Sequence, residues 1–176
     1  MENLISIALS KGAKNAAAVK VADLSFNREF RAACEQNTCG KYKTCWMCPP
    51  DVGDIDEMIA RAKAYENAMV FQTVNQLEDS FDIEGMEAAA KKHAALTAAI
   101  AKDVRPKIPG ALMLGAGACH ACDACARLEN KPCVHPEKAV ASLEAYGIAV
   151  SELAALCGMN YINGPNTVTF FGGVLY

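Results

Sequence analysis

The chain has 176 residues, of which 52% are hydrophobic and 21% charged, a composition typical of one globular domain rather than of a disordered chain. The net charge of −3 argues against a nucleic-acid partner. No segment approaches the ~18 apolar residues that cross a bilayer, and the first residues lack the basic start and long apolar run of an export signal, so we expect a cytoplasmic protein without a membrane partner.

The first third of the chain predicts three helices and one strand, read from apolar spacing and capping residues. Asp54 followed by Glu57 is a capping-box pattern, which indicates the start of the third helix. The Pro49-Pro50 pair predicts an extended chain just before it, because a residue that precedes proline avoids helical backbone angles. In chain order, the elements are a helix over 2–12, a strand over 16–24, a short helix after Asn27 that delivers Cys34, and a helix over 54–65.

The middle of the chain predicts a strand–helix–strand unit. Apolar residues recur at helical spacing from Ile83 to Val104, and apolar strands over 69–74 and 111–114 flank this helix. Such a crossover places its two strands parallel, with the helix on one face of the sheet. The second strand would then end at the edge of the sheet where open α/β proteins usually keep their binding sites.

The last third predicts two helices and a strand. Pro136 suits the first turn of a helix, and Ser151 suits the cap of a shorter one. A strand over 167–176 follows, unless the Gly172-Gly173 pair turns it into a hairpin. Together the elements predict an α/β or α+β fold, a single domain over 1–176 with a small, mostly parallel sheet, flanking helices and two cysteine-rich loops that bind metal.

Eight of the nine cysteines fall into two sets of four. In a reducing cytosol such cysteines rarely form disulfides, whereas four thiolates is the number that a tetrahedral zinc ion or a cubane cluster needs. We therefore expect both sets to bind metal rather than to act as small buried side chains. The first quartet is Cys34, Cys39, Cys45 and Cys48, and the second quartet is Cys119, Cys122, Cys125 and Cys133.

The spacing within the second quartet favours iron over zinc. Cys119, Cys122 and Cys125 form a C-x2-C-x2-C run, which is how ferredoxin-type loops wrap three corners of a [4Fe–4S] cluster. Zinc ribbons instead separate their C-x2-C knuckles by a dozen or more residues. Cys48-Pro49 resembles the cysteine–proline that closes ferredoxin motifs. Two [4Fe–4S] clusters are the favoured interpretation, with one cluster plus zinc, or two zinc ions, as alternatives.

Several residues near the quartets have more than one interpretation. His120 and His135 flank second-quartet cysteines, either as metal ligands or as neighbours of the ligands. Cys45 and Cys48 could instead be a dithiol redox pair, although the cysteines beside them favour metal. Cys157 stands apart, as a buried thiol or a spare ligand.

Five segments carry a family resemblance: Cys39-Gly40-Lys41-Tyr42, Cys45-Trp46-Met47-Cys48-Pro49-Pro50, the C-x2-C-x2-C run from Cys119, Pro132-Cys133-x2-Pro136 and Ser142-Leu143-Glu144-Ala145-Tyr146-Gly147-Ile148. This pattern resembles a prokaryotic domain-of-unknown-function family of predicted cysteine-rich metal-binding proteins, common in anaerobes and methanogens. The resemblance runs from about residue 1 to the final strand. It implies metal binding through the eight quartet cysteines.

Three function classes follow from two metal centres. The favoured one is electron transfer to, or within, a partner redox system; residues 1–50 carry seven Lys or Arg against four Asp or Glu, which would attract an acidic partner protein. The alternatives are a cluster-dependent enzyme and a structural zinc-binding or metal-sensing interaction module. No catalytic triad, phosphate-binding loop or dinucleotide fingerprint is present in the sequence. A cavity beside one metal centre would favour the enzyme.

Overall fold

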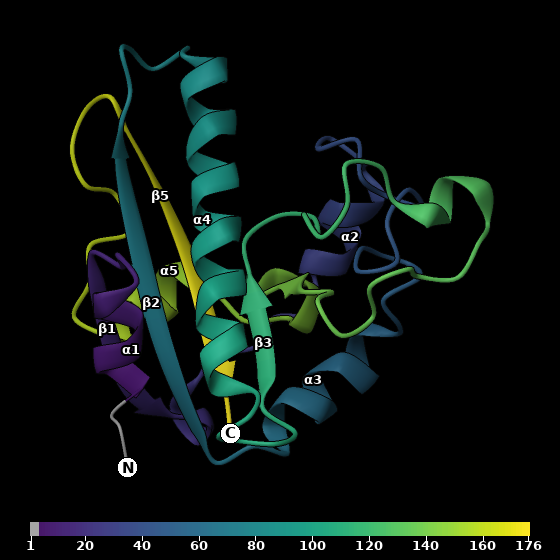
Figure 1. Cartoon of the computed structure of the whole chain (residues 1–176), viewed down its shortest axis with the longest axis horizontal. Helices are drawn as coiled ribbons and strands as arrows, with labels where there is room; N and C mark the ends of the chain where they lie inside the picture. Colours follow the sequence, from purple (N-terminus) through teal and green to yellow (C-terminus); the bar gives the residue numbers. More distant parts are fainter. Residues whose placement is uncertain (1–3) are drawn as a thin grey trace.

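The computed structural model, which describes residues 4–176, has a five-stranded sheet at its centre (Figure 1). In chain order the strands are β1 (Asn15–Lys20), β2 (Asn67–Gln76), β3 (Leu112–Gly115), β4 (Ala141–Ser142) and β5 (Thr167–Leu175). Their order in the sheet is β1-β2-β5-β3-β4, so that the last strand in sequence lies in the middle. The longest pairing joins β2 and β5, from Ala68 opposite Leu175 to Gln76 opposite Thr167.

The prediction of a mostly parallel sheet is wrong. β5 is antiparallel to both of its neighbours, β1 is antiparallel to β2, and the parallel pairing that the structure describes is the short one between β3 and β4. Because β2 and β3 are each antiparallel to β5, they nevertheless run in the same direction. The predicted strand–helix–strand crossover is therefore present, but it passes over β5 instead of joining adjacent strands.

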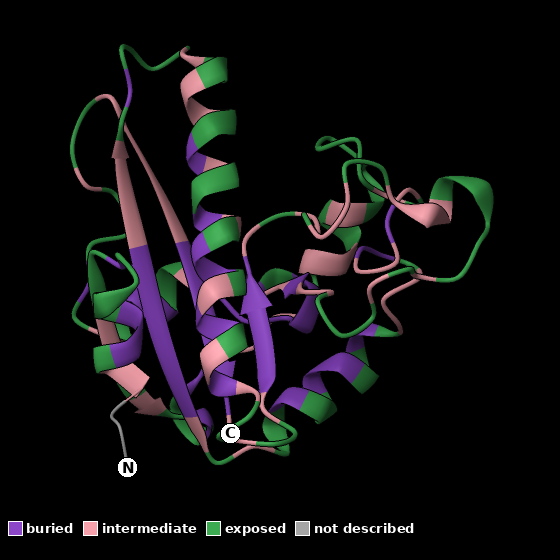
Figure 2. Ribbon diagram, in the orientation of Figure 1, coloured by how far each residue is buried: buried purple, intermediate pink, exposed green. Residues whose placement is uncertain are grey.

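Helices cover both faces of the sheet. They are α1 (Leu4–Ser10), α2 (Phe30–Glu35), α3 (Ile55–Lys63), α4 (Ile83–Val104) and α5 (Val150–Leu156), with 3-10 helices η1 (Val21–Asp23), η2 (Ala126–Glu129) and η3 (Glu144–Tyr146). Successive side chains of a strand point to opposite faces. Along β2, Met69 and Phe71 accordingly pack with α1 and α4, whereas Ala68 and Val70 pack with α3 and α5. The buried residues follow the sheet between these two layers (Figure 2).

The local predictions succeed where a capping residue marks the boundary. The Asp54 side chain accepts a hydrogen bond from the Asp56 N–H at the start of α3, and the Asp82 side chain does the same for Gly85 at the start of α4. The predicted helix after Pro136 is absent, because β4 and η3 occupy the segment that follows it. Ser151 lies within α5 rather than capping it. Residues 2 and 3 of the first predicted helix lie outside the described residues.

The Gly172-Gly173 pair continues β5 rather than turning it into a hairpin. Gly172 lies opposite Phe71 of β2, and a Cβ atom at this position would overlap the Phe71 ring. The same ring stacks on His93 of α4, with 5.5 Å between ring centroids. The glycine is therefore required by the close approach of an aromatic ring, not by a turn.

Two long connections lie away from this core. The first cysteine loop, residues 36–54, joins α2 to α3, and the second cysteine loop, residues 116–140, joins β3 to β4. Figure 1 shows them together on one side of the sheet, and Figure 2 shows that they are mostly exposed or half-buried. Pro49 and Pro50 lie in a turn of the first loop, linked by a cis peptide bond, so the predicted extended chain is not observed. Among the residues described, no helix combines the length and apolar character that a membrane crossing needs.

Candidate metal centre

The two quartets occupy the two cysteine loops, apart from Cys34, which lies in the last turn of α2. Burial differs strongly within the first quartet, since Cys45 and Cys48 are buried whereas Cys39 is exposed. All four cysteines of the second quartet are half-buried. The quartets therefore lie at the edge of the molecule, with their most protected sulfur atoms where the first loop meets the rest of the chain.

The two quartets meet at Cys45. The side chains of Cys48 and Cys125 and the backbone N–H groups of Met47 and Cys119 act on its sulfur. Led by the Cys48 contact, these interactions lower the pKa of Cys45 to about 5 against the opposing effect of burial. The same contact raises the pKa of Cys48. A cysteine of the first loop thus contacts two of the second loop.

The other cysteine side chains lie near members of their own quartet, but they do not surround a common point as the ligands of a metal would. Cys48 lies within electrostatic reach of Cys34 and Cys39, and Cys122 lies within reach of Cys119 and Cys133. Within residues 4–176, however, no three His, Cys, Asp or Glu side chains are set closely enough to form a ready-made metal site. A metal bound here would have to draw the loops inward, as is usual where binding and local folding are coupled.

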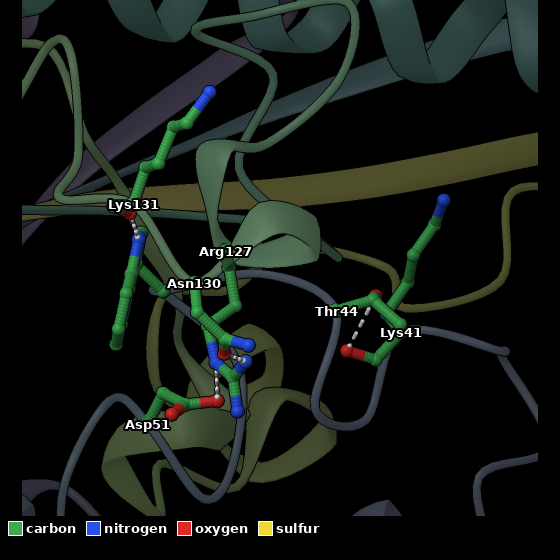
Figure 3. Close-up of polar contacts among 7 residues, drawn as sticks. Lys41, Thr44, Asp51, Arg127, Asn130 and Lys131 are labelled. Carbon is green, nitrogen blue, oxygen red and sulfur yellow. Dashed lines mark hydrogen bonds and ion pairs between the residues drawn. The ribbon is translucent and has the colours of Figure 1, made fainter.

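A clamp of three side chains holds the two cysteine loops together (Figure 3). The Arg127 Nε atom lies 2.8 Å from the Asp51 Oδ2 atom, in an ion pair that does not have the alignment of a hydrogen bond. The Trp46 indole N–H donates to the Lys131 carbonyl oxygen at 2.9 Å. The Arg127 guanidinium also lies 5.2 Å from the centroid of the Trp46 ring. Asp51 and Trp46 belong to the first loop and Arg127 to the second, so each contact bridges the loops.

Arg31 tests whether the site suits a metal–thiolate centre. One terminal nitrogen of its guanidinium donates to the Gly53 carbonyl oxygen at 2.7 Å, whereas its Nε and Nη2 atoms are buried without a partner in the described residues. Its charge acts on Cys34: burial raises the pKa of that thiol, and Arg31 opposes the rise. Four thiolates around zinc or a [4Fe–4S] cube carry net negative charge, which would compensate this unpaired cation. The residues fit the group in both donor type and charge.

The structure places the remaining cysteine and the three histidines in different surroundings. Cys157 directly follows α5 and packs against the core, and burial raises its pKa to about 11. His120 is exposed, and the Nδ1 atom of His135 lies 3.7 Å from a Glu137 carboxylate oxygen. Both histidines flank the second quartet, and neither side chain forms a hydrogen bond to a cysteine in the described structure. His93 is buried between Phe71 and Phe170, far in sequence from either quartet.

Neither the clamp nor the unpaired guanidinium of Arg31 was predicted from the sequence. Asp51 and Arg127 are far apart in the chain, and neither belongs to a motif with a recognisable spacing. Arg31 lies one helical turn before Cys34, and a cation at that distance from a proposed ligand is the signal that could have singled it out.

Comparison with known proteins supports metal binding. The family model described as "Predicted metal-binding protein (DUF2284)" matches residues 17–176, which is most of the chain. Searches of curated proteins and of solved structures gave no match. The match covers both cysteine loops, the clamp and every strand except the start of β1. The chain therefore belongs to the DUF2284 family of predicted metal-binding proteins.

Proposed function

We propose that the protein holds two [4Fe–4S] clusters and transfers electrons to, or within, a partner redox system. The first quartet would hold one cluster and the second quartet the other. The observation that carries the proposal is that the two cysteine loops lie against each other, joined by the Arg127–Asp51 and Trp46–Lys131 contacts, so that the two quartets are neighbours. Adjacent low-potential clusters are the arrangement by which ferredoxin-type proteins move single electrons.

The position of the quartets supports exchange with another protein. Six of the eight cysteines are half-buried or exposed, so an electron would not have to cross the core. Leu128 and Val134 of the second loop are each 61% exposed. Lys41 and Lys43 of the first loop are also exposed, and they lie between Cys39 and Cys45 in the sequence. Exposed apolar side chains together with cations suit a partner with an acidic, partly apolar surface.

The clusters would supply the electron chemistry, and the chain would hold and tune them. Arg31 places two unpaired N–H donors in the buried space near Cys34, where they would stabilise added negative charge. The backbone N–H of Cys119 is one of the groups that lower the pKa of Cys45. The Asp51–Arg127 and Trp46–Lys131 contacts keep the two loops together while charge changes.

Metal analysis of protein purified without oxygen tests the proposal directly. Two cubane clusters require about eight iron and about eight sulfide ions per chain. When each cluster is reduced by one electron, the two nearby clusters should give interacting paramagnetic signals. About two zinc ions and no iron would refute the cluster proposal and leave the structural, zinc-binding function. About four iron ions with one zinc ion would assign a single cluster.

Replacing single cysteines assigns the ligands. Cys122→Ser should remove one cluster, so the iron content should fall by about half. Cys157→Ser is the matched control, since Cys157 directly follows α5 and packs on the core, and its iron content should stay at the wild-type value. Because Cys45 lies beside Cys125, the iron content of Cys45→Ser, compared with the same control, tests whether the second cluster takes a ligand from the first loop. Unchanged iron in Cys122→Ser would contradict the assignment.

A second function, a cluster-dependent enzyme, has one specific observation in its favour. A cavity of about 650 Å³ lies beside the second quartet, and Cys119 is one of the residues that line it. Electron carriers need no such space, whereas an enzyme must bind a substrate next to its metal. An activity assay needs a candidate substrate, and the residues that line the cavity indicate which class of molecule to test.

A further inference from the structure

The cavity beside Cys119 is formed by three segments that meet at one end of the sheet. They are the second half of α4, the chain that leaves β3 from Gly115 to Ala121, and residues 137–141 just before and within β4. Figure 1 shows the chain leaving the end of β3 beside α4. Its volume of about 650 Å³ lies within the range of 300–1,000 Å³ that is usual for small-molecule sites.

The wall of the cavity consists mainly of small apolar side chains. Three alanines of α4, Ala94, Ala98 and Ala101, recur at helical spacing and face the alanines that follow β3, Ala116 and Ala118. Larger residues at these positions would fill the space, since protein interiors otherwise pack without voids of this size. The wall therefore offers apolar contact and few hydrogen bonds, which suits a ligand with a hydrocarbon or aromatic body.

The lining also carries charged side chains, two of them from the C-terminal end of α4. Lys102, Arg105 and Lys138 line the cavity together with one carboxylate, Glu137. In the described structure the side chains of Arg105 and Lys138 have neither a hydrogen-bond nor an ion-pair partner. A cation near the C-terminus of a helix is favourable on its own, which accounts for Lys102 and Arg105. Lys138, however, comes from a different segment and lines the same cavity.

We propose that this cavity binds a small organic anion, a carboxylate attached to an apolar body. The carboxylate would be held by Arg105 and Lys138, and the apolar body would lie against the α4 alanines. Arginine binds carboxylates through two parallel N–H···O bonds, which favours a planar carboxylate over a spherical ion. Such a molecule would lie against Cys119 and His120. As a substrate site the cavity rests on the second proposed function; as a binding site it does not depend on which metal is bound.

Isothermal titration calorimetry of the metal-loaded protein tests the proposal with a matched pair of probes. The acid is 3-phenylpropanoate, and its amide, 3-phenylpropanamide, has the same body without the charge. We expect the acid to bind at least tenfold more tightly than the amide. Arg105→Gln should weaken binding of the acid about tenfold and leave the amide unchanged. Lys91→Gln removes an exposed cation from the same helix outside the cavity lining, and should change neither affinity.

A second variant tests the location. Ala98 lines the cavity but is exposed on α4, so Ala98→Phe should fill the space without crowding the core, and both probes should lose binding. Metal content measured on each sample separates failure of this site from failure of the cluster proposal. The proposal is overturned by equal affinity for acid and amide, by equal binding of inorganic phosphate and acid, by unchanged binding in Ala98→Phe, or by no detectable heat.

Discussion

Replacing Arg127 with glutamine asks whether the clamp between the cysteine loops stabilises the protein. The substitution removes the ion pair with Asp51 and the cation–π contact with Trp46 while retaining a polar side chain of similar reach. The Asp51 carboxylate, whose side chain is only 15% exposed, would then lie next to the second loop without its partner. Loss of Arg127 should therefore loosen both loops at once.

The burial of the pair sets the size of the effect. Exposed ion pairs contribute about 0.2–1 kcal/mol, whereas breaking a fully buried pair costs about 3–5 kcal/mol. With side chains 20% and 15% exposed, the Arg127–Asp51 pair lies between these limits, at about 2 kcal/mol. The contact with Trp46 adds about 1 kcal/mol. The free energy of unfolding should fall by about 3 kcal/mol, which at a urea slope near 2 kcal/mol/M lowers the midpoint by about 1.5 M.

Trp46 provides the assay, because it is the only tryptophan in the sequence and donates its indole N–H across the loops. Its fluorescence during urea titration without oxygen reports on the clamp itself. Arg28→Gln is the matched control: Arg28 pairs with Asp56 at 2.6 Å, but these side chains are 70% and 57% exposed. The control should shift the midpoint by less than about 0.5 M. Equal shifts in the two variants would refute the reasoning.

Three further predictions concern the core and the metal. Gly172→Ala should destabilise the fold by about 2 kcal/mol or more in urea titration, because its Cβ meets the Phe71 ring, whereas Gly173→Ala, with its nearest neighbours at 3.6 Å, should cost less than about 1 kcal/mol. Burial lowers the pKa of His93 to about 4 from 6.5, so between these pH values only the unfolded chain binds the proton. The free energy of unfolding should therefore fall by about 3 kcal/mol as the pH drops from 6.5 to 4, and this pH dependence should be weaker in His93→Leu. Chelating the metal should expose both cysteine loops to limited proteolysis, because structural metal sites contribute on the order of 10 kcal/mol; equal protection with and without metal would contradict this.

The sequence predicts the elements whose boundaries are written locally. The α4 helix has the predicted bounds because its apolar spacing, the Asp82 cap and Pro106 all act within a few residues. The order of the strands in the sheet cannot be predicted in this way, because it depends on which strands β5 pairs with. Nothing within 167–175 shows that this segment separates β2 from β3, and the expectation of a mostly parallel sheet fails at this point.

Some features of the candidate site are likewise predictable from the local sequence, and others are not. The cysteine spacing indicates metal ligands from sequence alone, and the family match supports metal binding. The contact of Cys45 with Cys125 depends on how two distant loops pack, so no local spacing can reveal it. The cavity is harder still to predict, since its wall consists of alanines, which elsewhere in the chain are ordinary helix formers.

The central position of β5 has a consequence for how the protein is made. Every other strand leaves the ribosome before β5, and until β5 arrives the sheet consists of two separate two-stranded pieces, which are marginal in water. Both cysteine loops are therefore synthesised before the framework that brings them together can close. Metal insertion that needs both loops must follow synthesis of β5. A chain that stalls before Thr167 would present free thiols and the open edges of β2 and β3, which are features that promote aggregation.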